Sequence, residues 1–142
     1  MRDFIPQIEP WIDGSELIEL KRVVDSTFVT EHKLTEEFEE MIKELTGSKY
    51  AVSVTNGTAA LFCCLKALGI GPDDEVIVPN ITFVATSNSV IMTGATPIFC
   101  EVDKHTFCID PEQIKTLITS KTKAIMPVHL YGQSADMPEV ME

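Results

Sequence analysis

Short apolar segments alternate along this chain with segments of helical periodicity. The apolar segments are near-continuous runs, and they predict strands over residues 50–54, 75–78, 96–102 and 123–128. The remaining periodic segments predict helices over 15–26 (capped by Asp13 or Ser15), 34–45, 57–68, 83–92, 111–118 and from 136 onward. Strands without a polar side are buried on both faces, which is typical of a parallel sheet between layers of helices. The sequence therefore predicts an α/β fold, with a mostly parallel sheet and helices on both faces.

Length and charge narrow the possible classes of protein. The 142 residues suffice for one domain with a sizeable core, and 44% of them are hydrophobic. The formal net charge of -11 leaves no basic surface for nucleic acid or anionic lipid, so neither is expected as a partner. No apolar window approaches the roughly 18 residues of a membrane span, and no targeting segment precedes the first helix. A cytoplasmic location is therefore expected.

The cysteines and histidines do not form a recognisable metal or disulfide pattern. Cys63 and Cys64 lie in a helix that is expected to be buried, and Cys100 and Cys108 complete no Cys-x-x-Cys pair. The three histidines are isolated in the sequence. Free core thiols and the absence of a metal site are therefore expected.

The segment 52–61 passes from a β-branched run through Asn56, Gly57 and Thr58 directly into an Ala/Leu-rich helix. Small residues at such a turn leave backbone N–H groups open at the helix start, where the helix dipole also favours an anion. Thr58 adds a hydroxyl that can donate to a phosphate oxygen. This pattern predicts a phosphate site. The alternative is that Asn56 or Thr58 simply caps the helix, and the segment by itself leaves both interpretations open.

The ligand site of a parallel sheet lies at the carboxyl ends of its strands. Three segments directly follow predicted strands here: 56–58, 79–82 and 129–132. We therefore expect these segments to line one crevice.

Five segments closely resemble the DegT/DnrJ/EryC1/StrS aminotransferases, which are pyridoxal-phosphate sugar aminotransferases. They are VTNGTAAL (54–61), GIGPDDEVIVP (69–79), TFVAT (82–86), GATP (94–97) and PVHLYG (127–132). The resemblance extends from about Phe4 to Glu142 and keeps the order of the motifs. It implies part of a fold-type I aminotransferase large domain, pyridoxal 5'-phosphate as cofactor, and a homodimer with active sites at the subunit interface. The implied reaction transfers an amino group, usually from glutamate, to a nucleotide-linked keto sugar.

The resemblance also assigns site residues. Gly57 and Thr58 match the positions that hold the cofactor phosphate, and Phe83 matches the aromatic residue that stacks on the pyridine ring. For Phe83 the alternative is ordinary core packing at the start of a helix. Neighbouring residues on the same strand-end loops receive no role; they are Asn80, Thr82, His129 and Tyr131.

The family's Schiff-base lysine and the aspartate that pairs with the pyridinium nitrogen lie, in its pattern, beyond Glu142. We therefore expect residues 1–142 to be the amino-terminal part of the large domain, without a catalytic residue and inactive in transamination when isolated. Two alternatives remain open. One is a pyridoxal-phosphate-dependent sugar dehydratase of the same family, and the other is a short, catalytically inactive paralogue that acts as a binding or assembly subunit.

Overall fold

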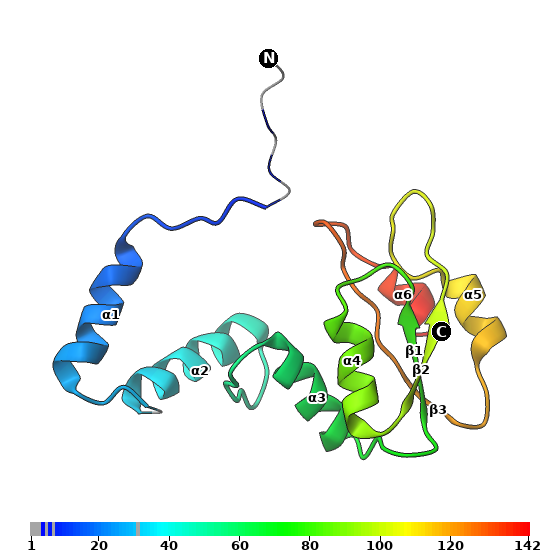
Figure 1. Cartoon of the computed structure of the whole chain (residues 1–142), viewed down its shortest axis with the longest axis horizontal. Helices are drawn as coiled ribbons and strands as arrows, with labels where there is room; N and C mark the ends of the chain where they lie inside the picture. The colour runs from blue at the N-terminus through cyan, green and yellow to red at the C-terminus, as the bar shows by residue number, and fades with distance from the viewer. Residues whose placement is uncertain (1–3, 5, 7, 31) are drawn as a thin grey trace. The chain divides into compact units, whose positions relative to one another are not determined.

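The computed structural model of the chain describes residues 4, 6, 8–30 and 32–142. The chain divides into two compact units, Met1–Ser53 and Val54–Glu142. The first unit contains two helices and the second contains a sheet with its covering helices, as the labels in Figure 1 indicate.

The two helices of the first unit are α1 (Ser15–Ser26) and α2 (Lys33–Thr46), as the sequence predicted. At the start of α1 the Asp13 carboxylate accepts a hydrogen bond of 3.0 Å from the Ser15 amide. At the end of α2, Gly47 adopts a φ of 69° and its amide donates to the Lys43 carbonyl at 2.8 Å. A left-handed glycine is the commonest way for a helix to end, because it lacks the Cβ that would oppose this conformation.

The apolar faces of α1 and α2 are exposed. From the helical spacing of the sequence we expect Phe38, Ile42 and Leu45 to mark the buried side of α2. Neither helix contains a buried residue, however, and Phe38 and Leu45 are 53% and 82% exposed. The prediction that this face is buried was therefore wrong. The reason is that helical periodicity identifies an apolar face but not the surface that covers it.

The second unit is built on a three-stranded parallel sheet of order β2-β1-β3. Its strands are β1 (Glu75–Pro79), β2 (Thr96–Cys100) and β3 (Thr122–Ile125). Its helices are α3 (Gly57–Ala67), α4 (Ala85–Thr93), α5 (Pro111–Leu117) and α6 (Met137–Val140). Each of these elements corresponds to a segment predicted from the sequence, with shifts of up to three residues at the ends.

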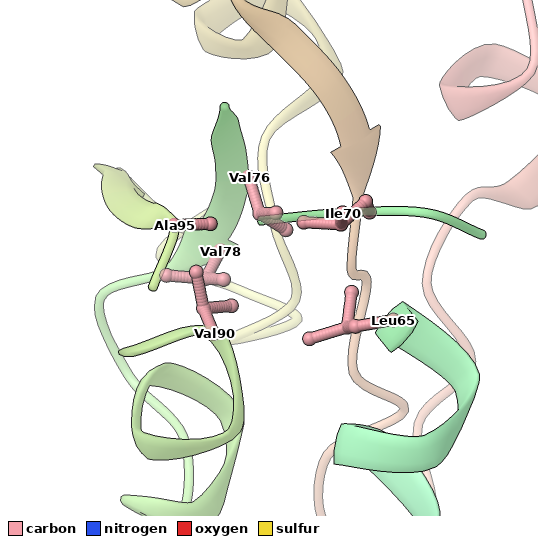
Figure 2. Packing of buried hydrophobic residues seen from close by; sticks show 6 residues of the cluster. All are labelled: Leu65, Ile70, Val76, Val78, Val90 and Ala95. Atoms are coloured by element: carbon pink, nitrogen blue, oxygen red, sulfur yellow. The ribbon is translucent and has the colours of Figure 1, made fainter. Parts of the chain in front are cut away.

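The central strand β1 is buried on both faces. Val76 and Val78 point to one face, where they form a cluster with Leu65 of α3 and Val90 of α4 (Figure 2). Ile77 points to the opposite face and packs with a second cluster that includes Ile114 of α5. Burial of each such side chain contributes about 1.5–3 kcal/mol. The predicted α/β fold, a parallel sheet with helices on both faces, is therefore confirmed.

The predicted strand over 50–54 is not present, and this segment has no regular secondary structure. A strand needs a neighbouring strand to pair with, and residues 50–54 pair with none of the three strands that the structure describes. Instead, the amide and hydroxyl of Ser53 donate to the Glu39 carboxylate at 2.7 and 2.9 Å, and Val52 is 81% exposed. The β-branched composition of the segment did not suffice to form a strand without a partner.

The four cysteines are free thiols, in agreement with the prediction. Cys100 and Cys108 are buried, and burial raises the pKa of the Cys100 thiol. Cys63 and Cys64, in contrast, are exposed on α3, so the expectation that all four lie in the core was wrong. Among the described residues, no helix has the length and apolar character needed to cross a bilayer.

Candidate functional site

The carboxyl ends of β1 and β2 are joined by Asn80, the first residue after β1. Its amide donates to the Cys100 carbonyl at 2.9 Å, and its side-chain Nδ2 donates to Oε2 of Glu101 at 2.8 Å. Because the strands are parallel, the loops that follow them lie at one edge of the sheet. The sequence predicts Asn80 at this edge, but it does not single out the partner Glu101.

Helix α3 begins toward the same edge. Figure 1 shows α3 and α4 running in the same general direction, opposite to that of β1, so that both helices start toward the end at which β1 finishes. Asn56 precedes α3 in an extended conformation, and its Oδ1 accepts a 2.9 Å hydrogen bond from the Ala59 amide. Its carbonyl accepts from the Ala60 amide at 3.0 Å. Asn56 is therefore the cap of this helix.

Capping by Asn56 does not use all of the backbone N–H donors at the start of α3. Within the part of the chain that the structure describes, the amides of Gly57 and Thr58 donate to no protein acceptor. Two unpaired N–H groups at the positive end of an 11-residue helix provide the donors and the field that an anion requires. Capping and anion binding, which the sequence left as alternatives, are thus compatible at this turn.

Gly57 leaves open space beside these amides. A Cβ built on Gly57 would meet no atom within 4 Å, and this glycine does not adopt a left-handed φ. Neither packing nor backbone conformation therefore requires glycine at this position. Its missing side chain instead leaves room for a ligand next to the open N–H groups, while Thr58 is half-buried in the first turn. This arrangement fits a phosphate group.

Phe83 lies in the loop between β1 and α4, and its side chain is 75% exposed. Core packing, the alternative that the sequence left open for this residue, is therefore not its environment. An exposed aromatic ring at the carboxyl-end edge of the sheet offers a flat apolar surface on which a planar ring can stack.

Two hydroxyl groups are in contact where the loop that carries Phe83 meets α4. Oγ1 of Thr82 lies 2.9 Å from Oγ1 of Thr86, a residue of α4 that is only 4% exposed. Thr86 is not among the site residues that the sequence predicts. Its spacing of four residues from Thr82, which places the two on one side of a helical turn, was the available signal.

His129 and Tyr131 lie in the segment that follows β3, and both are exposed. Nδ1 of His129 accepts a 3.0 Å hydrogen bond from the Ala135 amide. Tyr131 adopts a left-handed φ of 52°, followed by Gly132 at 80°. The segment therefore turns sharply at Tyr131 and Gly132, two residues after the histidine.

The sequence of the chain matches a known family model. The model described as the DegT/DnrJ/EryC1/StrS aminotransferase family matches residues 10–142. Among curated relatives, the spore coat polysaccharide biosynthesis protein SpsC of Bacillus subtilis is 42% identical over 138 residues, which cover 97% of this chain and 36% of that protein. GDP-perosamine synthase of Caulobacter vibrioides is 45% identical over 134 residues, which cover 94% of this chain and 36% of that enzyme.

A solved structure resembles the chain as a fold. NtdA from Bacillus subtilis with bound cofactor PMP superimposes with a TM-score of 0.82 at 37% identity, over 89% of this chain and 30% of that one. The chain thus spans about a third of the length of these relatives.

Proposed function

The chain belongs to the DegT/DnrJ/EryC1/StrS aminotransferase family, and we propose that it supplies the cofactor contacts of a pyridoxal-phosphate-dependent sugar aminotransferase. In this proposal Gly57 and Thr58 bind the cofactor phosphate and Phe83 stacks on the cofactor ring. The residues 1–142 form the amino-terminal part of the large domain, and the residues that exchange protons with the substrate belong to other parts of the enzyme.

The observation that carries the proposal is the pair of unpaired amides at the start of α3, beside the open space at Gly57. A phosphate is a dianion with several acceptor oxygens, so the amides of Gly57 and Thr58 and the Thr58 hydroxyl can each donate to it. These hydrogen bonds carry charge on the acceptor, which makes each of them about twice as strong as a neutral one.

Phe83 would orient the cofactor rather than react with it. A ring stacked on Phe83 while its phosphate is held at α3 is fixed at two points, which determines the face that it presents to a substrate. When bound, the cofactor supplies the electron sink for amino-group transfer. The contribution of this chain is therefore binding and orientation.

We propose a nucleotide-linked keto sugar as the amino acceptor and an amino acid, usually glutamate, as the donor. The names of two relatives support this choice, because GDP-perosamine synthase is named for a nucleotide-linked amino sugar and SpsC for polysaccharide biosynthesis. Free thiols at all four cysteines agree with a reducing compartment, and we place the enzyme in the cytoplasm.

We further propose that the enzyme is a homodimer to which the first unit contributes. Its two helices border an apolar groove of about 810 Å³, lined in part by Ile18, Val23, Phe38 and Met41. Exposed apolar faces of this extent are typical of surfaces that bind another protein surface. A second copy of the chain satisfies this requirement without another kind of partner.

The test is cofactor retention by the protein expressed from its complete coding sequence. Thr58→Ala removes one hydroxyl donor to the phosphate, so we expect the visible absorption band of the bound cofactor to decrease more rapidly during dialysis than in the wild type. Thr35→Ala is the matched control, because Thr35 is also a half-buried threonine in the first turn of a helix. Equal retention in both variants would remove Thr58 from the site.

A further inference from the structure

Thr86 makes a contact that differs from those of the other buried hydroxyls of α4. Ser89 and Thr93 donate to backbone carbonyls of their own helix, the Thr86 carbonyl at 2.9 Å and the Val90 carbonyl at 2.7 Å. Thr86 instead pairs through its hydroxyl with Thr82, a residue of the preceding loop. A helical threonine can satisfy its hydroxyl on the carbonyl of the preceding turn. The Thr86 hydroxyl could therefore be satisfied within its own helix, and its contact with Thr82 in addition connects α4 to the preceding loop.

This contact fixes one end of the loop between β1 and α4. The other end is fixed by Asn80, whose side chain donates to Glu101 at 2.8 Å. Between the two fixed points lies Phe83, whose carbonyl accepts a 3.1 Å hydrogen bond from the Thr86 amide. The backbone of Phe83 is thus held while its ring stays 75% exposed. The backbone of such a loop is held in place while the aromatic ring that it carries stays accessible.

We propose that Thr82 and Thr86 are positioning residues whose hydroxyl pair holds the loop in the conformation that presents the Phe83 ring to the cofactor. This inference rests on the proposed function. A loop that is already ordered loses less conformational entropy on binding, so the pair strengthens cofactor binding without touching the cofactor. Loss of either hydroxyl frees the loop and weakens stacking.

The first experiment measures the loop without cofactor. In the apoprotein from the complete coding sequence, Thr82→Val and Thr86→Val each remove the pair at nearly constant volume. We expect hydrogen exchange in peptides spanning residues 80–86 to accelerate roughly two- to tenfold, the range for loss of one hydrogen bond. Thr82→Ser keeps the hydroxyl and restores slow exchange. Unchanged exchange in both valine variants would overturn the proposal.

The second experiment measures the cofactor. Titration with pyridoxal phosphate, followed by visible circular dichroism, reports the affinity and the asymmetry of the ring environment. We expect Thr82→Val and Thr86→Val to weaken binding roughly two- to tenfold and to diminish the dichroic band. The control is Thr93→Val, which removes a buried hydroxyl at the far end of α4. We expect its band to match the wild type.

The outcomes separate this inference from the function on which it rests. Faster exchange with an unchanged cofactor band overturns the positioning role, and so does an equal loss of the band in Thr93→Val. If Thr58→Ala still releases the cofactor in either case, the proposed function stands without the positioning role. If the wild-type protein binds no pyridoxal phosphate, both proposals fail.

Discussion

Replacement of Gly57 by alanine tests whether this glycine is required for folding or for ligand binding. A Cβ at this position meets no atom within 4 Å, and the backbone does not adopt a left-handed φ. Alanine restricts the unfolded chain more than glycine does and is the better helix former, so a compatible replacement stabilises a protein by about 0.4–1 kcal/mol. We therefore expect apoprotein with Gly57→Ala to unfold at an equal or slightly higher temperature.

The same substitution weakens cofactor binding. The new methyl group lies in the space beside the open amides of Gly57 and Thr58, where the proposed phosphate sits. Displacement of the phosphate from one amide loses a hydrogen bond to a charged group, which contributes about 1.5–3 kcal/mol. Since about 1.4 kcal/mol corresponds to a tenfold change, the dissociation constant of pyridoxal phosphate rises roughly 10- to 100-fold.

Two measurements on the complete protein check this prediction. Thermal unfolding of the apoprotein reports the fold, and absorbance titration with pyridoxal phosphate reports the site. Gly71→Ala is a matched control: its Cβ would make only an ordinary contact, 3.8 Å from the Thr93 carbonyl, and Gly71 also lacks a left-handed φ. We expect it to leave cofactor affinity unchanged. A less stable Gly57→Ala protein with wild-type affinity would show that this glycine is required for folding and not for phosphate binding.

Two further predictions concern the turn at Asp103 and the groove of the first unit. The amides of Thr106 and His105 hold the pKa of Asp103 below its ordinary value of 3.8, so the stability that this turn provides is present above that pH and is lost as the pH falls through the lowered pKa. The carbon chemical shift of the Asp103 carboxyl group should therefore titrate with a midpoint below pH 3.8, and a midpoint above pH 3.8 would contradict this. Phe38→Glu places a charge on the apolar face of α2 and should shift the protein toward monomer in sedimentation velocity. The control Glu36→Gln, outside the groove, should not change the monomer–dimer equilibrium. A dimer of unchanged strength in Phe38→Glu would exclude this face as the interface.

The elements of the second unit were predictable because local signals and packing agree. Residues 76–78 (Val-Ile-Val) are apolar throughout, and the structure buries them on both faces between α3, α4 and α5. The cap of α3 was predictable only in part, because the sequence offered Asn56 or Thr58 and the structure identifies Asn56. In these segments the residue types specify both the local conformation and the environment that stabilises it.

The predicted strand over 50–54 and the predicted burial of the apolar face of α2 were wrong for a common reason. Their patterns identify apolar or β-branched surface, but a strand also requires a neighbouring strand and an apolar face requires a cover. Val52 is 81% exposed and Leu45 is 82% exposed, so neither requirement is met within the described chain. The periodicity of a sequence identifies an apolar face that must be covered or a strand that must be paired. Only the tertiary structure shows whether another part of the protein covers that face or pairs with that strand.

The candidate site illustrates the same distinction in its polar groups. From the sequence, capping and phosphate binding are alternative interpretations of Asn56, Gly57 and Thr58, because the sequence does not show how many backbone amides pair with the capping side chain. The first four amides of a helix lack partners within the helix, and the Asn56 side chain engages only that of Ala59. The amides of Gly57 and Thr58 therefore remain available on a helix that is already capped. A helix start of this kind can be stable without a ligand and still bind an anion, and for this reason substitution at Gly57 is expected to change affinity without loss of the fold.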